Sequence, residues 1–536
     1  MIGLSAAPGT AAPLDLLHGF EGVYSGWIPA DPAIAAGPDS LVTMVSGRIA
    51  VFSKQGGKLF EQALGSGGFW AAQGADQVAE PCVIFDPNSG RFIASAADFG
   101  SRKGFLYFAV SKHSNPVSAA DWHKYSLDRT GVHQKPGFSG VATYPDFAKL
   151  GVDHQAVYVT SLQFEKQAVG AGFSHAEIFA IEKAPLLAGG AFSVIEVAPV
   201  IVSERFSWIQ PALVFGVPPA MYFVESVALN PGASIVVHAV TDLFTTPTIT
   251  SSPVTVAAFD KPPTVPQRGS SIPLENIDAR LLSAVVRNGS LWTAHGIRDP
   301  LSDGESLVRW YEFDVAGLPA TGATLVQSGN VDPGPGVHAW LPAINADADG
   351  NMGLVCSVGG ASQYASIGYT GRLVSAPAGT TLPVRIARAG AGPYTMGGWG
   401  EYGGLAMDPD GSTFWLLHEY PTKQKVWRTF VGAFRLGSGD AVNAPPSADA
   451  GPDQSVTDTD NNGVEVVALN GAYSADADGS IVSWRWSEGS TVLGTGVTMS
   501  AILSVGIHAV VLTVTDDAGA SDSDTVVVEV RRKRGR

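Results

Sequence analysis

The sequence predicts an all-β protein with more than one domain, and three observations predict it. The 536 residues include 63 glycines and 35 prolines spread along the chain, which suits many short strands joined by tight turns. Hydrophobic residues make up 45% and charged residues only 15%, which is enough apolar material for a sizeable core. No long stretch has the 3.6-residue apolar period of an amphipathic helix. We therefore expect strands throughout.

A repeated hairpin pattern organises most of the chain. Each copy has a polar or aromatic start, an apolar run, a turn and a second apolar run. The copies begin at Asp31, Glu80, Tyr144, Gln210, Asp278, Leu341 and Tyr402. They recur at intervals of about 60 residues. Asn-Gly at 288–289 and Asp-Gly at 349–350 and 410–411 are typical of the turn between two hairpin strands.

Further β-rich segments lie between the copies, at 47–54, 104–112 and 308–315. They would supply the outer strands of each unit. Seven units of four strands predict a seven-bladed β-propeller, with six blades as the alternative if one hairpin is wrongly assigned. We place this propeller at residues 25–437, after an N-terminal extension at 1–24.

Three segments of this region, 29–54, 80–92 and 398–420, resemble a family of secreted bacterial β-propeller proteins of poorly characterised function. The motif P-x-x-x-x-D-P-x-x-G-x-F/W is distantly similar to the repeats of sialidase-like propellers. The resemblance implies the fold and export, and it carries no catalytic assignment. A set of the S-x-D-x-G-x-x-W boxes typical of sialidases is not found, which weighs against sialidase activity.

The composition changes after a linker at 438–446, which contains glycine, asparagine and two prolines. Segments 445–456, 469–486 and 506–530 closely resemble a PKD (polycystic-kidney-disease) domain. The resemblance implies an immunoglobulin-like β-sandwich at 447–531, and the strand-like runs there agree with it. Residues 532–536 form a basic tail.

The candidate site follows from the geometry of a propeller. The first strand of each blade lies nearest the axis, so first-strand starts and second-strand ends share one rim. That rim collects acids, two histidines and an arginine. The candidate catalytic residues are Glu401, His418, Glu80 and Asp278, and the candidate ligand-binding residues are Asp31, Asp146, Arg280, His295, Tyr402 and Glu419.

Two patterns on this rim leave alternatives open. Trp-x-x-His occurs at 292–295 and 415–418, at the same place in two repeats. The histidines would be ligands for one metal or sugar, or hydrogen-bonded rim residues. Asp278 and Arg280 are two residues apart and share a strand face, as a structural salt bridge or as part of a funnel that orients an anionic ligand.

The acidic turns of the C-terminal module suit Ca²⁺, which prefers oxygen ligands. The candidate ligands are Asp476, Asp478 and an acidic pair placed at positions 515 and 516. The residues at these two positions are Thr515 and Asp516. The alternative is that Asp and Asn simply favour tight turns. No organic cofactor is expected. Cys82 and Cys356 are expected to be buried free thiols, with one isolated disulfide as the alternative.

These features predict an extracellular or cell-surface binding or scaffold protein. The propeller would present a face for a glycan or a surface protein, and the PKD module would be a spacer or adhesion unit. The alternatives are a glycan-active hydrolase or lyase that uses carboxylates on one rim, and a structural subunit of a surface assembly.

Bulk properties narrow the partners and the location. The net charge of −16 repels phosphate backbones and argues against nucleic acid. No apolar run reaches the ~18 residues of a membrane span. The first residues lack the basic and long apolar regions of a signal peptide. We expect a secreted or cell-surface protein whose export signal is absent from this sequence.

Overall fold

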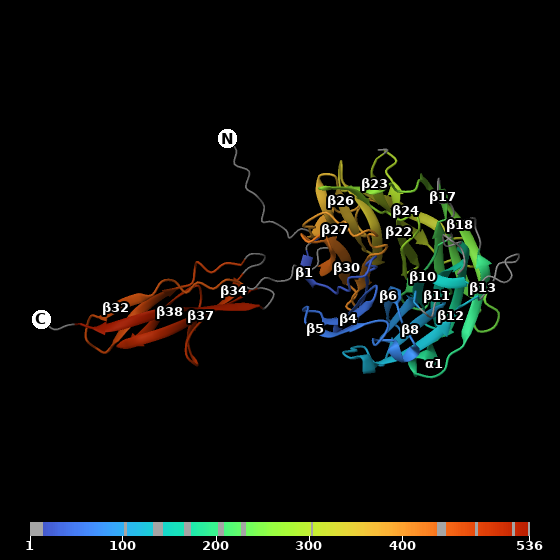
Figure 1. Cartoon of the computed structure of the whole chain (residues 1–536). Helices are drawn as coiled ribbons and strands as arrows, with labels where there is room; N and C mark the ends of the chain where they lie inside the picture. Colours follow the sequence, from blue (N-terminus) through green and yellow to red (C-terminus); the bar gives the residue numbers. More distant parts are fainter. Residues whose placement is uncertain are drawn as a thin grey trace. The chain divides into compact units, whose positions relative to one another are not determined.

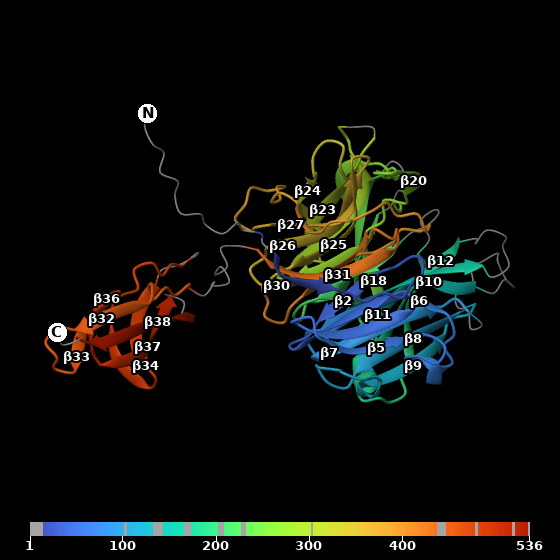
Figure 2. The same cartoon turned by 60° about the vertical axis from the view of Figure 1, so that its left-hand side comes forward.

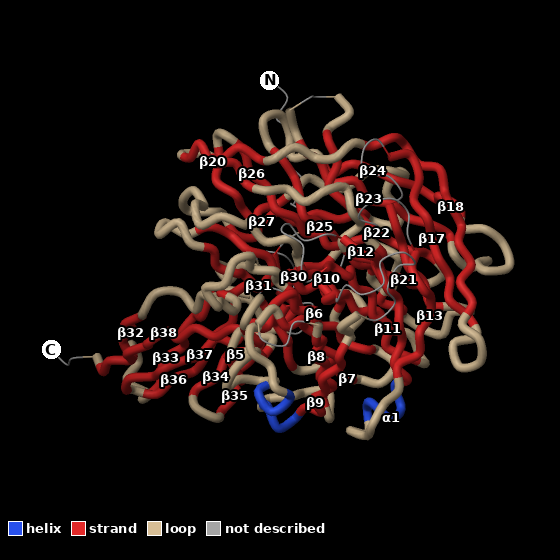
Figure 3. Tube along the Cα trace, turned by 45° about the vertical axis from the view of Figure 1, so that its right-hand side comes forward, coloured by secondary structure: helices blue, strands red, loops and turns tan. Residues whose placement is uncertain are grey.

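The structure is a computed structural model that describes residues 14, 16–100, 104–131, 143–165, 173–201, 208–226, 232–301, 304–436, 446–476, 481–516 and 520–533. These residues form two compact units, a larger one within 14–437 and a smaller one within 438–536. Strands dominate both, as Figure 3 shows in red. The helices among the described residues are α1 (Lys183–Leu187) and two single 3₁₀ turns, Ala71–Gln73 and Ala119–Asp121. The protein is therefore all-β, as predicted.

The larger unit contains seven antiparallel groups of four strands. The first three groups are β2 (Ala33–Ala36), β3 (Ser40–Val45), β4 (Arg48–Ser53) and β5 (Lys58–Ala63); β6 (Val78–Asp86), β7 (Arg91–Asp98), β8 (Phe105–Ser111) and β9 (Trp122–Asp128); and β10 (Thr143–Val152), β11 (Ala156–Glu165), β12 (Phe173–Glu182) and β13 (Val194–Ile201). In each group the strands pair in chain order, because short turns join consecutive strands.

The next three groups repeat this order. They are β14 (Ile209–Pro211), β16 (Met221–Ser226), β17 (Gly232–Thr241) and β18 (Thr248–Phe259); β21 (Ser283–Arg287), β22 (Ser290–Arg298), β23 (Ser306–Asp314) and β24 (Thr324–Val331); and β25 (His338–Ala346), β26 (Met352–Gly360), β27 (Gln363–Arg372) and β28 (Arg385–Arg388). A separate hairpin, β19 (Val265–Gln267) with β20 (Ser270–Leu274), lies between the fourth and fifth groups in the chain.

The seventh group joins the two ends of this unit. It contains β29 (Gly404–Met407), β30 (Thr413–Pro421), β31 (Trp427–Arg435) and, paired with β31, β1 (Leu16–Glu21). The sequence analysis placed residues 1–24 in an extension outside the propeller. The position of Leu16–Glu21 corrects this boundary, because that segment satisfies the backbone groups of the edge of β31.

The first strands of the seven groups contact one another in a closed cycle. β2 contacts β6, β6 contacts β10, and the contacts continue through β14, β21, β25 and β29 back to β2. A short strand, β15 (Leu213–Val214), pairs in parallel with both β10 and β21. In Figure 1 the colours run around the unit from blue to orange, and β30 returns beside β1. We call the line enclosed by this cycle the central axis.

The predicted hairpins agree with this arrangement. Each of the seven repeat copies supplies a first strand and the second strand that pairs with it. The turns predicted at 288–289, 349–350 and 410–411 join β21 to β22, β25 to β26 and β29 to β30. In Figure 2 the first strands β2, β6, β10 and β25 can be followed within the unit.

The smaller unit contains seven strands in two sheets. One sheet has the order β32 (Gln454–Asp458), β38 (Ser521–Arg532), β37 (Gly506–Asp516), β34 (Ile481–Glu488) and β35 (Thr491–Thr495), and the other pairs β33 (Val464–Asn470) with β36 (Thr498–Ser504). Trp486 is fully buried in its core, and Trp484 packs against that core. Residues 438–445 of the predicted linker and 534–536 of the predicted tail lie outside the described residues.

Candidate functional site

The structure gathers most of the predicted rim residues around the central axis. They come from the starts of first strands, joined by the end of β30 and by one residue that the sequence analysis did not select, Lys149. We call this group the central cluster: Asp31, Glu80, Asp146, Lys149, Asp278, Arg280, Glu401, Tyr402 and Glu419.

Backbone irregularities aim several of these side chains at the axis. Four first-strand segments contain a residue with left-handed backbone: Asp31 (φ 51°), Glu80 (φ 52°), Phe147 (φ 51°) and Leu341 (φ 53°). At the last three, the pairing with the second strand shifts register, as in a β-bulge. This conformation is uncommon for residues other than glycine. Each bulge breaks the two-residue alternation of side chains along its strand.

Lys149 is the cation at the middle of the cluster. Its Nζ lies 3.0 Å from the centroid of the Tyr402 ring and 5.5 Å from that of Trp208. Burial lowers the pKa of Lys149, while the negative charges of Glu80 and Asp31 act in the opposite direction. The lysine is therefore held by a cation–π contact and by surrounding carboxylates, without a salt bridge within 4 Å among the described residues.

The carboxyl groups share a crowded, dry environment that favours their protonated forms. Burial, and then repulsion from Asp31, raises the pKa of Glu401 to about 8. Burial also raises the pKa of Asp146 to about 6, although the backbone N–H of Phe147 acts against the shift. The pKa of Glu80 lies well above its usual range through burial and through the charges of Asp31 and Glu401. The cluster therefore holds protons at neutral pH.

Hydrogen bonds fix the orientation of two of these acids. The Tyr402 hydroxyl donates to Glu80 Oε2 at 2.7 Å. Asp31 accepts from the Ser46 hydroxyl at 2.8 Å and from the Glu401 backbone N–H at 3.1 Å. The last bond ties the first and seventh groups together across 370 residues of chain.

Asp278 and Arg280 form the salt bridge that was one of the two sequence alternatives. Arg280 Nε and Nη2 donate to the two carboxylate oxygens of Asp278, both at 2.7 Å. The guanidinium carbon lies 5.0 Å from the Phe147 ring centroid and 4.9 Å from that of Trp208. One nitrogen, Nη1, is buried and has no hydrogen-bond partner among the described residues.

Other buried polar atoms in this region are also without partners in the described part of the chain. They are Glu401 Oε2, Glu419 Oε2 and Gln163 Oε1. Glu419 is 0% exposed, and its other oxygen accepts the Gly400 N–H at 2.5 Å. Burial raises the pKa of Glu419 well above its usual range. Buried polar atoms are normally satisfied, so these atoms are exceptions within the central region.

The two histidines do not point at the axis as free ligands. His295 Nδ1 bonds the Ala279 carbonyl at 2.7 Å and Nε2 bonds the Tyr311 hydroxyl at 3.0 Å. His418 Nε2 donates to the Leu341 carbonyl at 3.2 Å, and Nδ1 accepts the Glu419 N–H at 2.9 Å. Burial lowers the pKa of both to about 4. They are neutral groups whose nitrogens are already used.

Lys149 and Trp208 could not be selected from the sequence by strand position alone. The available signal was a lysine inside an otherwise apolar run, which predicts either a functional site or a buried ion pair. Cys82 and Cys356 are free thiols, as expected.

The calcium candidates belong to the smaller unit. Position 515 carries no carboxylate, which corrects that assignment: the Thr515 hydroxyl bonds Ser521 at 2.8 Å. Asp516 accepts the Ala520 N–H at 2.9 Å, and Asp478 lies outside the described residues. No group of three or more His, Cys, Asp or Glu suited to a metal ion occurs among the described residues, Asp476 included.

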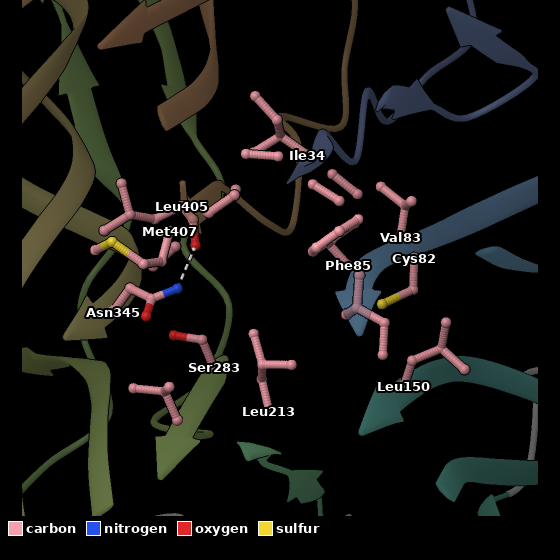
Figure 4. Close-up of a pocket in the computed structure, with 18 of the residues that line it drawn as sticks. Ile34, Cys82, Val83, Phe85, Leu150, Leu213, Ser283, Asn345, Leu405 and Met407 are labelled. Carbon is pink, nitrogen blue, oxygen red and sulfur yellow. Dashed lines mark hydrogen bonds between the residues drawn. The ribbon is translucent and has the colours of Figure 1, made fainter. Parts of the chain in front are cut away.

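A cavity of about 340 Å³ occupies the other part of the central axis (Figure 4). Its lining comes from all seven first-strand segments and is mostly apolar. Lys149 and Tyr402 also line it, so they separate it from the carboxylates of the central cluster.

Comparison with known proteins identifies one part of the chain. Residues 443–530 match the family model described as PKD domain. This region is a PKD domain. It is also similar to the solution structure of the PKD domain from KIAA 1837 protein, with 27% identity over 18% of this chain and 97% of that one, at a TM-score of 0.15. PKD domains are typical of extracellular proteins, where they have adhesion or spacer roles.

Several solved structures are distantly similar to most of the chain. One is a protein of unknown function from Dyadobacter fermentans, with 10% identity over 79% of this chain and all of that chain, at a TM-score of 0.38. Another is an α-L-arabinofuranosidase from Lactobacillus brevis, with 15% identity over 61% and 94%, at a TM-score of 0.29. The search of curated proteins found no match. Within the described residues, no helix is long and apolar enough to cross a membrane.

Proposed function

We propose that residues 14–437 form a seven-bladed β-propeller that binds a ligand at the central cluster, in a secreted or cell-surface binding protein. The closed cycle of first strands and the seven four-stranded groups support the propeller. The PKD domain supports the extracellular location and would serve as spacer or adhesion module.

The observation that carries the binding proposal is the set of buried, partner-free polar atoms. Glu401 Oε2 and Glu419 Oε2 are acceptors, and Arg280 Nη1 is a donor. A glycan offers many hydroxyl groups that both donate and accept, so it can satisfy both kinds of atom at once. The rings of Trp208 and Tyr402 lie 6.2 Å apart, and the Lys149 ammonium lies over both. We therefore propose a glycan ligand.

A glycan array with the full chain tests this proposal. Glu401→Gln and Glu419→Gln preserve the size of the side chains and remove the carboxylates. Each should weaken binding of the captured glycan by at least about tenfold, because the amide NH2 group of glutamine can only donate a hydrogen bond, whereas the carboxyl oxygen that it replaces can also accept one. The matched control is Glu312→Gln, whose carboxylate bonds Ser290 and Gln327 on an outer strand. Equal loss in all three variants, or unchanged binding in both cluster variants, would contradict the proposal.

A second candidate, a glycan-active hydrolase or lyase, is favoured by the raised pKa of Glu401, about 8. A carboxyl group that stays protonated at neutral pH can act as a general acid, while a neighbouring acid with a lower pKa, such as Asp146 at about 6, stays ionised. A polysaccharide hydrolysis assay distinguishes the candidates. Release of product by the wild-type protein and its loss in Glu401→Gln would favour the enzyme, whereas glycan binding without product release favours the binding protein. Self-assembly of the protein without glycan binding or product release would favour a structural subunit.

A further inference from the structure

The cavity on the central axis is a second candidate site, which shares Lys149 and Tyr402 with the central cluster and is lined by none of its carboxylates. Figure 4 shows side chains from several first strands pointing into it, among them Ile34, Phe85, Leu150, Leu213 and Met407. These apolar side chains surround the cavity on all sides, because each first strand contributes residues two apart on its axial face.

Its inner end is closed. Lys149 and Tyr402 lie there with Gln210, and all three are buried. The Tyr402 hydroxyl is directed to Glu80, and the Lys149 ammonium lies over the Tyr402 ring. Their polar ends are thus engaged with each other and with the cluster.

The polar side chains in the wall already have partners. Asn345 Nδ2 donates to the Leu405 carbonyl at 3.1 Å, drawn as a dashed line in Figure 4, and its Oδ1 accepts the Ala346 N–H at 2.9 Å. Ser283 Oγ accepts the Ile344 N–H at 3.0 Å. Burial raises the pKa of the Cys82 thiol, so it stays neutral. The wall therefore favours an apolar ligand, because its polar side chains already have hydrogen-bond partners.

The open end lies at the hairpin turns. The exposed Pro87 and Pro409 and the half-buried Arg287 belong to the lining. Arg287 Nη1 donates to the Ala346 carbonyl at 3.1 Å. Asp408, also at this end, is paired with Lys54 at 2.7 Å. A ligand would enter here and leave a polar head among charged turn residues.

The dimensions limit the shape of the ligand. In the segments 32–36, 81–85 and 282–285 the lining covers four to five consecutive residues, or about 13–17 Å at about 3.3 Å per residue. A volume of about 340 Å³ over that length leaves a cross-section of roughly 20–25 Å². This is close to one extended hydrocarbon chain. The volume is more than twice the roughly 150 Å³ of an apolar cavity that holds benzene.

We propose that this cavity binds an unbranched alkyl chain, which enters from the hairpin-turn end and leaves its polar head at the mouth. The site needs no carboxylate of the central cluster, so its test does not depend on the glycan proposal.

Titration calorimetry of the full chain with 1-decanol and with decanoate tests the site. Binding of either compound supports it, and binding of decanoate alone adds that Arg287 holds the head. Leu405→Trp fills the cavity and should weaken binding at least about tenfold, whereas Leu405→Ala should retain it. If Leu405→Trp does not give the wild-type circular dichroism spectrum, Met407→Trp replaces it. Absence of binding by both decyl compounds, or undiminished binding in the filled variant, would overturn the proposal.

Cys82 reports the location of the bound chain. In a Cys356→Ser background, modification by N-ethylmaleimide reads Cys82, which lines the cavity. Saturating 1-decanol should slow this modification at least about fivefold, because the reagent and the chain compete for one space. The variant that also carries Cys82→Ser is the control for background labelling. Binding without protection of Cys82 would place the chain elsewhere and contradict the proposal.

Discussion

The two parts of the central axis are built from the same seven strands and differ completely in chemistry. At the strand starts, four acids lie around Lys149 with the Asp278–Arg280 pair, and Glu419 joins them from the end of β30. A few residues further along the same strands, the wall is made of Ile34, Leu213 and similar side chains. Lys149 and Tyr402 form the boundary. A repeated strand pattern therefore does not give the same chemistry along the whole central axis.

The difference originates at the bulges. At Glu80 and Asp146 a register shift breaks the alternation, and at Asp31 a left-handed backbone does so without a register shift. Beyond them the strands alternate regularly and present apolar residues. Charge at one end and a neutral cavity at the other are thus consequences of a local change in backbone conformation. Substitutions at the two ends should therefore change stability by different amounts.

Removal of the boundary cation should have the largest effect. Lys149→Met leaves the surrounding carboxylates without a compensating charge and should cost about 3–5 kcal/mol of unfolding free energy at pH 7. The cost should be smaller at pH 5, where more of the carboxyls are protonated. Urea unfolding at both pH values measures it. Lys58→Met is the control, because its pair with Glu61 is exposed to solvent and should be worth about 1 kcal/mol or less. Similar costs for both variants would contradict a special role for Lys149.

The acidic end should also set the pH dependence of stability. The folded-state pKa values of Glu401, about 8, and Asp146, about 6, are raised above those of the unfolded chain. Such groups contribute stability that is fully present below about pH 4 and is lost as the pH rises through the folded-state pKa. The melting temperature of the larger unit should therefore fall between pH 5 and pH 9. Glu401→Gln should flatten the upper part of that fall, and an unchanged slope in this variant would refute the assignment.

The apolar end should tolerate truncation better than the solid core. Leu405→Ala enlarges an existing cavity and should cost about 2 kcal/mol, at the low end of the range for buried leucines. Leu417, fully buried between neighbouring groups, should cost about 4 kcal/mol when replaced by alanine. Chemical denaturation of the two variants measures the difference. A cost for Leu405→Ala equal to that of Leu417→Ala would mean that the space is filled in the folded protein.

The smallest effect is expected from calcium. In the acidic loop at 458–463, the Asp458 carboxylate accepts the N–H groups of Asn462 and Gly463 at 3.2 Å and 2.9 Å, as expected of a turn. Addition of calcium or of a chelator should move the melting temperature of the full chain's PKD transition by no more than about 1 °C. A clear rise with calcium would instead show a site that includes residues outside the described part.

The sequence by itself determined the elements of this protein. Asn-Gly and Asp-Gly turns, apolar runs of strand length and a polar residue at each strand start are local signals, and they predicted seven hairpins, the PKD domain and the acids of the central cluster. Each signal spans fewer than about 20 residues, so it can be read without knowing what packs against it.

Only the tertiary structure decided how these residues act. Left-handed backbone at Asp31 and Glu80 is unfavourable in isolation and persists only where surrounding contacts hold it. The burial of Lys149, and the burial that keeps His295 and His418 neutral, depend on the packing of neighbouring strands; the carbonyl group of Leu341, which His418 contacts, is 77 residues away in the chain. The pairing of β1 with β31 likewise joins segments about 400 residues apart. Such contacts depend on closure of the whole cycle of strands, and no local pattern encodes them.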